Sequence, residues 1–204
     1  MDRFKNLDIK DLSQSPFTQF ETWFEFAKKN VSLYPEAFSV SSIDQEGYPN
    51  SRYVLLRGYK PPIFQFFTNY NSQKGQSLLQ NPKACMLFYW KDLGQQIRIW
   101  GDVKKSSTED SDVYWTTRPL ESRIHAMASN QSAEVKDFKE FLNLIHKLEK
   151  DYEHKNLPRP KNWGGFDFTA HKFEFWQEGE FRLHHRFLYT QSSKKDWAIQ
   201  RLYP

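Results

Sequence analysis

The chain has 204 residues, 38% hydrophobic and 26% charged, which is enough for one well-buried domain and too apolar for a disordered chain. Its net charge of +4 favours an anionic partner, but the Lys and Arg residues are scattered, and no basic run or RNP-type motif indicates nucleic acid. A lone cysteine, Cys85, excludes an intrachain disulfide, and no apolar stretch reaches 18 residues, so we expect a cytoplasmic protein that does not enter membranes.

The first half of the chain is predicted to combine two helices with short strands. Ser15 and Pro16 suit the start of a helix, because apolar side chains then recur at helical spacing. A second helix is predicted from about 72 to 80. The predicted strands span 37–43, 50–59, 63–69, 84–90 and 96–104.

The second half is predicted to hold further helices followed by strands. Thr108 is the predicted cap of a helix that ends near Pro119, and the longest helix should span about 135–152. A turn at 163–165 should lead into strands near 166–176, 184–190 and 196–202. Short strands with inserted helices indicate a mainly β fold with added helices (α+β), organised as a barrel. Aromatic residues make up 17% of the chain, and they either fill its core or line a pocket for a planar ligand.

The segment Arg182-Leu-His-His-Arg186 carries the strongest local signal. In a strand, Arg182, His184 and Arg186 would share one face, which would form a site for an anion or a developing negative charge. A solvated basic edge that protects the sheet from aggregation explains the same residues equally well.

A second cluster combines Tyr114 and Arg118, four residues apart on a helix, with Ser122 at the start of the next helix. A phenol, a guanidinium, a hydroxyl and a helix N-terminus suit a phosphate, although an ordinary helix surface is the simpler explanation. Thr68, Ser72 and Lys74 form a third group at a strand end and a helix start, again with phosphate-binding chemistry.

Arg52 and Arg57 lie five apart in one predicted strand, so they face opposite sides unless a bulge intervenes. The histidines His125, His146, His154 and His171 are scattered and are expected to be surface or structural residues, with no zinc spacing among them. No Gly-x-Ser-x-Gly or GxGxxG motif is present, which disfavours nucleophilic catalysis and Rossmann-type nucleotide binding.

In chain order these clusters resemble the pyridoxamine-5'-phosphate oxidase family. The matching stretches run from about residue 18 to the C-terminus, and several dispersed motifs in one order are more specific than any of them alone. They are RYVLLRG (52–58), FFTNYNSQK (66–74), NPKACMLFYW (81–90), RPLESRIHAMASNQS (118–132), NWGGF (162–166), EFWQ (174–177), RLHHRFLY (182–189) and RLYP (201–204).

The resemblance implies one FMN-binding split β-barrel domain over 1–204 that forms a homodimer, with 1–14 flexible and 163–204 completing the dimer and active site. It implies oxidation of pyridoxamine or pyridoxine 5'-phosphate to pyridoxal 5'-phosphate, with molecular oxygen as acceptor and hydrogen peroxide as product. By motif, Arg182 and His184 would act at the substrate ring, and Arg57, Tyr114, Arg118 and Ser122 near its phosphate. The FMN contacts would be Arg52, Tyr53, Val54, Leu55, Thr68, Ser72, Gln73, Lys74, Gln96, Gln131, Ser132, Trp176 and Arg186.

The sequence departs from the family pattern at four positions. Arg57 replaces a usual Lys, Gln73 a usual Arg, Glu178 a usual Gly and His185 a usual Asp, and a basic, aromatic N-terminal segment is not found. By strand parity His185 should point away from Arg182 and act indirectly. Two alternatives stay open: a related FMN oxidase of the phenazine-biosynthesis type, and a split-barrel protein that binds FMN or pyridoxal phosphate without catalysis.

Overall fold

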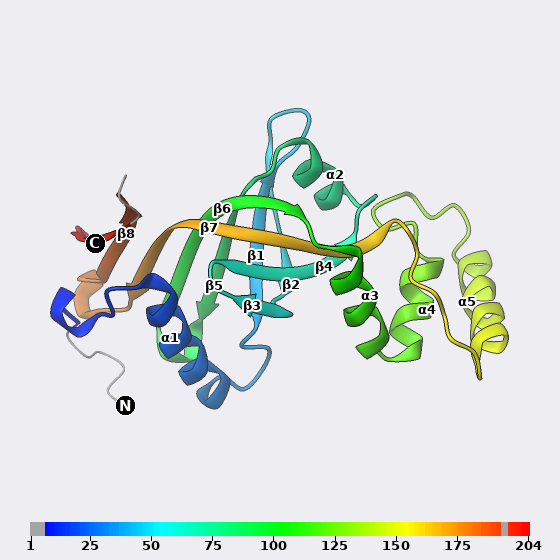
Figure 1. Cartoon of the computed structure of the whole chain (residues 1–204), viewed down its shortest axis with the longest axis horizontal. Helices are drawn as coiled ribbons and strands as arrows, with labels where there is room; N and C mark the ends of the chain where they lie inside the picture. Colours follow the sequence, from blue (N-terminus) through cyan, green and yellow to red (C-terminus); the bar gives the residue numbers. More distant parts are fainter. Residues whose placement is uncertain (1–6, 193–195) are drawn as a thin grey trace.

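In the computed structural model, residues 7–192 and 196–204 are described, and they form one curved sheet with helices on its inner face and at one end (Figure 1). The helices are α1 (Pro16–Asn30), α2 (Gln73–Gln80), α3 (Thr108–Thr117), α4 (Leu120–Ala128) and α5 (Phe138–Tyr152), with 3-10 turns η1 (Ile9–Asp11), η2 (Lys91–Leu93) and η3 (Glu180–Arg182). The strands are β1 (Ala37–Ile43), β2 (Pro49–Leu55), β3 (Gly58–Lys60), β4 (Ile63–Asn69), β5 (Lys83–Trp90), β6 (Gln95–Lys105), β7 (Trp163–Gln177), β8 (His185–Gln191) and β9 (Trp197–Leu202). The predicted class, mainly β with added helices, is confirmed.

The long strand β7 organises the sheet. The strand order is β2-β1-β5-β6-β7-β4-β3, and β8 and β9 continue from β7. One edge of β7 pairs with β6, while the other pairs first with β4 over residues 163–169 and then with β8 over residues 172–177. The sheet therefore divides along a single edge of β7, and this division is the split of the barrel.

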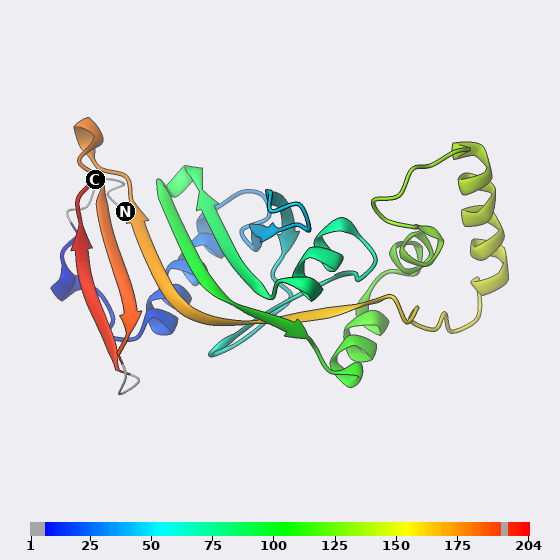
Figure 2. The ribbon, with the colours of Figure 1, turned by 90° about the horizontal axis from the view of Figure 1, so that it is seen from above.

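A β-bulge in β7 lies at this division, because Trp100 pairs with Lys172 while Gly101 pairs with Ala170, which leaves His171 as the extra residue. The register between β6 and β7 shifts between Trp100 and Gly101. A Cβ on Gly101 would lie 2.3 Å from the carbonyl oxygen of Thr169, so the close approach of the two strands requires glycine at this position. The bulge adds local twist, which allows β7 to curve from one half of the sheet into the other (Figure 2).

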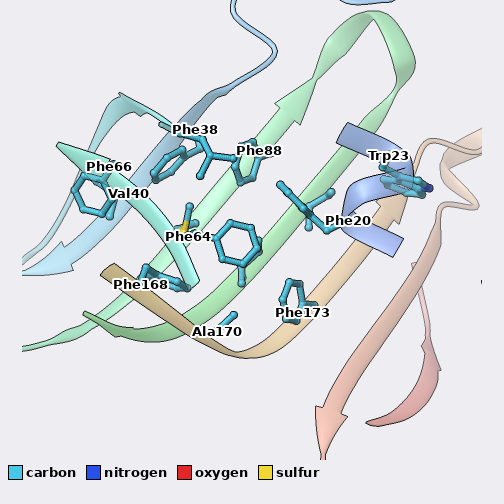
Figure 3. Packing of buried hydrophobic residues seen from close by; sticks show 14 of the residues in the cluster. Phe20, Trp23, Phe38, Val40, Phe64, Phe66, Phe88, Phe168, Ala170 and Phe173 are labelled. Atoms are coloured by element: carbon cyan, nitrogen blue, oxygen red, sulfur yellow. The ribbon is translucent and has the colours of Figure 1, made fainter. Parts of the chain in front are cut away.

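The inner face of the sheet is filled with phenylalanine. Phe20 and Trp23 of α1 point into the same core as Phe38, Phe64 and Phe88 (Figure 3). The ring centroids of Phe20 and Phe64 lie 4.9 Å apart at an interplanar angle of 81°, which is the edge-to-face geometry that aromatic pairs favour. Most of the aromatic excess therefore serves packing.

A second, smaller core joins the helices α3, α4 and α5 to the start of β7. It contains Trp115, Ile124, Ile145, Leu157 and Trp163. These helices lie at the opposite end of the molecule from β8 and β9 (Figures 1 and 2). None of the described helices has the length and apolar character needed to cross a membrane.

Two predicted elements are wrong for reasons that matter to the site. The predicted strand 50–59 is two strands, because the chain changes partner: the N–H of Leu56 donates to Glu36 at 2.9 Å, and the N–H of Arg57 donates to Gln65 of β4 at 2.8 Å. The predicted turn at 163–165 is instead the beginning of β7, because Gly164 and Gly165 pair with residues of β4.

The helix starts differ in detail from those predicted from the sequence. Ser15 occupies the N-cap position of α1, but its side chain makes no capping hydrogen bond. Ser107, rather than Thr108, caps α3. Helix α5 begins at Phe138 because Asp137 accepts hydrogen bonds from the N–H groups at its start, and residues 135–137 lie outside the helix. Of the segment predicted to be flexible, residues 1–6 lie outside the described residues, and 9–11 form η1.

Replacing Phe64 by Ala should destabilise the protein by about 3–5 kcal/mol, because a fully buried ring would leave a cavity among neighbouring rings. The measurement is urea unfolding followed by tryptophan fluorescence. Phe138→Ala is the control, since Phe138 is 62% exposed, and its expected effect is below about 0.5 kcal/mol. Equal midpoints for the two variants would contradict this description of the core.

Candidate functional site

The main cavity, of about 740 Å³, opens between the ends of β2 and β4 and the helices α3 and α4. It is lined by ten residues that the sequence analysis proposed as site residues: Tyr53, Val54, Leu55, Arg57, Thr68, Lys74, Tyr114, Arg118, Ser122 and Gln131. None of its lining residues in the described chain is acidic. A cavity with several cations and no carboxylate has a positive potential and attracts anions.

Lys74 forms the first polar cluster of this cavity. Its Nζ donates to Thr68 Oγ1 at 2.8 Å, to Ser72 Oγ at 3.3 Å and to Gln131 Oε1 at 3.4 Å. Lys74 is 8% exposed, so its charge is held by neutral oxygens away from water. Burial, and then the positive charge of Arg52, lower the pKa of Lys74 to about 8. An anion bound here would stabilise the charged form and raise this pKa.

The local sequence explains this cluster. β4 ends at Asn69, and Ser72 then caps α2, its hydroxyl accepting from the N–H of Gly75 at 3.3 Å. The first residues of α2 therefore carry both Lys74 and the free N–H groups of a helix start. Gln73, also in this turn, is exposed.

Arg52 lies close to this cluster without lining the cavity. Its guanidinium donates to Ser42 Oγ at 2.8 Å, and burial lowers its pKa. The change of partner after Leu55 places Arg52 in β2 and Arg57 beyond its end, so strand parity does not relate these two arginines. Arg57 lines the cavity, and its Nη1 lies 3.7 Å from Glu36 Oε1.

Arg118 forms the second polar cluster, together with Arg57, Tyr114 and Ser122. Arg118 follows the last turn of α3, and its Nη2 donates to the carbonyl oxygen of Ser122 at 3.0 Å. Burial lowers the pKa of Arg118, and the nearby Arg123 and Arg57 lower it further. Ser122 lies in the first turn of α4, which begins at Leu120 rather than at Ser122.

A third group lies on the outer face of the sheet, toward the C-terminal end of the chain. The register places Gln96, Trp176 and Arg186 side by side on β6, β7 and β8. Arg186 Nε donates to the buried Glu174 at 2.9 Å, and Arg98 contacts the same carboxylate. Burial alone would raise the pKa of Glu174, but hydrogen bonds from Arg186 and Arg98 outweigh it and lower the pKa.

The strand predicted from 184 begins at His185, so the expected shared face of Arg182, His184 and Arg186 is wrong. Arg182 lies in η3, where Phe181 and Arg182 have φ of 52° and 66°, a conformation that no strand contains. Arg182 is exposed, and His184 packs against Trp176 with ring centroids 4.7 Å apart. Within one chain these residues do not line the main cavity, and η3 lies at the end of the molecule opposite α4 and α5 (Figure 2).

His185 is buried beside Arg201. The Arg201 guanidinium nitrogen lies 2.9 Å from His185 Nδ1, so the ring accepts this bond in its neutral form. Burial, Arg201 and His184 lower the pKa of His185. Both residues line a second cavity, of about 810 Å³, with His184 and Tyr203.

Sequence reasoning missed several lining residues. His125 was expected to be a surface or structural residue, yet it lines the main cavity with Ser122, Ala126 and Ser129. His125, Ala126 and Ser129 follow Ser122 by three, four and seven residues, and this helical spacing, which places residues on one face, was the available signal. Trp163 also lines the cavity, but no local pattern predicted it, because it reaches the site only through the pairing of β7 with β4. Ser132, with φ of 73°, follows Gln131 and is exposed.

A split barrel whose cavity combines cations, hydroxyls and aromatic rings defines a class of proteins suited to small anionic ring compounds. Residues 26–149 match the family model for pyridoxamine 5'-phosphate oxidase, and residues 163–204 match the model for the pyridoxine 5'-phosphate oxidase C-terminal dimerisation region. The chain belongs to the pyridoxamine 5'-phosphate oxidase family.

Relatives agree over nearly the whole chain. A pyridoxine/pyridoxamine 5'-phosphate oxidase of Paraburkholderia phytofirmans is 42% identical over 98% of this chain and 93% of its own, and one from Paraburkholderia phymatum is 43% identical with the same coverage. Among solved structures, PhzG from Burkholderia lata 383 in complex with tetrahydrophenazine-1-carboxylic acid has a TM-score of 0.91 at 27% identity, over 99% of this chain and 100% of its own. A pyridoxamine 5'-phosphate oxidase-related, FMN-binding protein of Nostoc punctiforme PCC 73102 shares the fold, with a TM-score of 0.75 at 15% identity over 94% and 99%.

Acidification should weaken the pairing of β8 with β9 through His185. Its pKa is lowered in the folded state, so stability falls as the pH drops below the unfolded value of about 6.5. His185→Asp supplies a carboxylate to Arg201, and the contribution of that carboxylate to the stability of the fold should persist down to about pH 4. Between pH 7.5 and 5, the melting temperature of the wild type should fall by about 2–4 °C more than that of the variant. His146→Asp, at an exposed position, is the control; if it behaves like His185→Asp, the assignment is wrong.

Proposed function

We propose that this protein oxidises pyridoxamine or pyridoxine 5'-phosphate to pyridoxal 5'-phosphate, using FMN and molecular oxygen and releasing hydrogen peroxide. The observation that carries the proposal is that one acid-free cavity holds two separate cation and hydroxyl clusters, at Lys74 and at Arg118. Two clusters match two phosphates, one on the cofactor and one on the substrate. The oxidase names of relatives at 42–43% identity support the same reaction.

The residues around Lys74 fit the phosphate of FMN. Lys74 is surrounded by hydroxyl and amide oxygens, and its lowered pKa marks a cation whose charge lacks compensation. Thr68, Ser72, Gln131 and the nearby Arg52 would complete this site. FMN, when bound, accepts a hydride from the substrate and returns two electrons to oxygen. Gln73, in place of a second cation, would leave Lys74 as the main charged group of α2 at this phosphate.

The substrate phosphate would bind at Arg57, Tyr114, Arg118 and Ser122. These residues provide two guanidiniums and two hydroxyls on the α3 and α4 side of the cavity. Arginine suits this task because its planar donors match the geometry of a phosphate. The substrate ring would then extend from this cluster toward the cofactor, with its C4' carbon exposed to hydride transfer.

We propose that a second copy of the chain completes each site. Gln96, Trp176, Arg182, His184 and Arg186 were all assigned to the site by motif, yet none of them lines the main cavity within one chain. The match of residues 163–204 to a dimerisation region supports a homodimer in which one subunit's C-terminal end faces the partner's cavity. Arg182 and His184 would there orient the substrate ring and balance charge during hydride transfer.

A phenazine-type oxidase is the second candidate, favoured by the TM-score of 0.91 to PhzG. The ligand bound to PhzG carries a carboxylic acid, and such a group also suits a cationic cluster.

A cytoplasmic location stays a prediction, based on the single cysteine.

The direct test is to mix the FMN-loaded protein with pyridoxamine 5'-phosphate in the absence of oxygen. The flavin absorption should bleach, and readmission of oxygen should restore it with one peroxide and one aldehyde formed per turnover. Arg182→Leu should lower kcat/KM by at least about tenfold while FMN remains bound, since it removes a charge placed at the substrate ring. Bleaching by a reduced phenazine carboxylate, but not by the vitamer, would favour the second candidate. No bleaching by either would favour a non-catalytic protein.

The affinity for FMN should fall at alkaline pH because Lys74 loses its proton. With a pKa of about 8 before the phosphate binds, Lys74 is mostly neutral at pH 9, and the dissociation constant should rise by about tenfold relative to pH 7. Titration of flavin fluorescence measures this constant. Lys74→Arg keeps its charge over the range and should show no such rise. An equal rise in both proteins would contradict the role of Lys74.

A further inference from the structure

The guanidinium of Arg118 packs over two indole rings, whose own centroids lie 4.9 Å apart. Its central carbon is 4.5 Å from the ring centroid of Trp163 and 5.3 Å from that of Trp115. Nη2 donates to the carbonyl of Ser122, while Nη1 is buried and has no hydrogen-bond partner among the described residues. No carboxylate contributes to the lowered pKa of Arg118. Aromatic faces therefore hold this cation without neutralising it.

The indole of Trp163 also belongs to an aromatic stack with Phe67 and Tyr114. The rings of Phe67 and Tyr114 stack with centroids 3.9 Å apart, and the planes of Tyr114 and Trp163 differ by only 8°. Trp163 therefore contacts Arg118 and lies parallel to Tyr114, both of which belong to the second polar cluster. Trp163 thus links the aromatic stack that holds Tyr114 to the guanidinium of Arg118.

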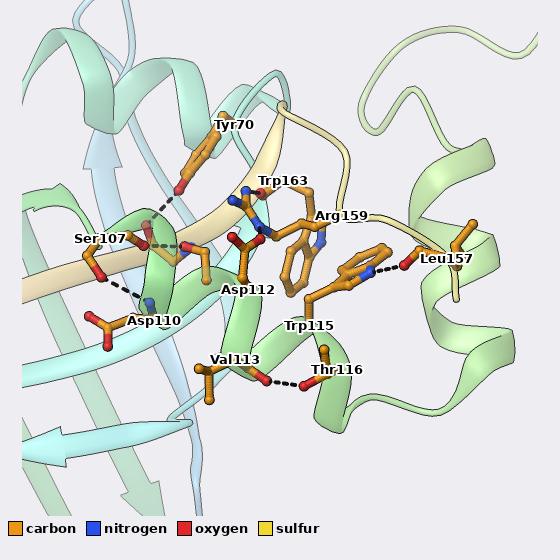
Figure 4. A network of polar contacts seen from close by, with 12 residues as sticks. Tyr70, Ser107, Asp110, Asp112, Val113, Trp115, Thr116, Leu157, Arg159 and Trp163 are labelled. Atoms are coloured by element: carbon orange, nitrogen blue, oxygen red, sulfur yellow. Dashed lines mark hydrogen bonds and ion pairs between the residues drawn. The ribbon is translucent and has the colours of Figure 1, made fainter. Parts of the chain in front are cut away.

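Both tryptophan residues are themselves anchored, Trp163 through its backbone and Trp115 through its indole N–H. Arg159 donates to the backbone oxygen of Trp163 at 2.6 Å and pairs with Asp112 of α3 at 2.6 Å, and Trp115 Nε1 donates to the carbonyl of Leu157 at 2.8 Å (Figure 4). Trp115 and Trp163 are 2% and 6% exposed, so neither ring can turn away from Arg118 without opening the smaller core.

We propose that Trp163 is a positioning residue that holds Arg118 ready for the substrate's phosphate and so determines the preference for phosphorylated over unphosphorylated substrates. Arginine stacks on aromatic rings through its planar face, which does not use its N–H groups, and Nη1 of Arg118 has no hydrogen-bond partner among the described residues. A carboxylate partner, such as Glu174 beside Arg186, would instead compete with the phosphate. The inference rests on the proposed function, because it takes the ligand at Arg118 to be a phosphate.

The test compares binding of pyridoxal 5'-phosphate and pyridoxal to the FMN-loaded dimer. Trp163→Leu should raise the dissociation constant of pyridoxal 5'-phosphate by about tenfold, and Trp163→Phe by less, because a smaller ring keeps part of the attraction. The dissociation constants of pyridoxal and FMN should change by less than about twofold. Trp90→Phe is the matched control, since Trp90 is equally buried and donates to Pro35 in the main core, away from Arg118.

If the role of Trp163 were merely structural, Trp163→Leu would weaken the binding of pyridoxal 5'-phosphate and of pyridoxal in parallel, and that result would overturn the inference. In an Arg118→Met background, Trp163→Phe should cause no further loss of pyridoxal 5'-phosphate binding; an undiminished loss would overturn it as well. The proposed function is judged separately. A wild-type protein that binds the phosphorylated ligand without oxidising its amine analogue refutes the oxidase proposal alone, whereas equal affinity for both ligands refutes the phosphate assignment and the inference together.

Discussion

The structure depends on the way one strand serves three partners. β7 pairs along one edge with β6 and divides its other edge between β4 and β8. A single strand can do this only if it bends, and the bulge opposite Gly101 allows the close approach that the bend needs. The residues before the division carry Trp163 into the main cavity, and those after it carry Glu174 and Trp176 to the outer face. The two groups of candidate site residues are therefore separated by the same feature that holds the sheet together.

Three buried or half-buried cations are stabilised in three different ways. Lys74 is held by neutral oxygens, Arg118 by indole rings and Arg186 by the carboxylate of Glu174. The first two arrangements leave a net positive charge, and both border the main cavity. In the third, Glu174 contacts both Arg98 and Arg186, so one carboxylate orients two arginines and offsets only part of their charge. This distribution of charge is the physical basis for assigning anion binding to the cavity rather than to the outer face alone.

The sequence predicted nearly every helix and strand, because apolar spacing reports directly on burial. It also identified ten lining residues of the cavity, nine of which lie within the stretches RYVLLRG, FFTNYNSQK and RPLESRIHAMASNQS. The failures have a common cause in long-range pairing. The break after Leu55 arises from competition between β1 and β4, the strand at Gly164 exists because β4 lies beside it, and strand parity could not anticipate the left-handed backbone at Arg182. The role of Trp163 was hidden for the same reason.

The change of partner between Leu56 and Arg57 has a consequence for how such a chain can evolve. The stretch from Arg52 to Arg57 is attached to β1 at one end and to β4 at the other, so its length is fixed by two independent hydrogen-bond registers. Side chains here can be exchanged one at a time, as the arginine at position 57 illustrates. Inserting or deleting a single residue would instead reverse the facing of every side chain on one side of the break. Descendants of this sequence should therefore vary in the residue types of the stretch from Arg52 to Arg57 while keeping its number of residues.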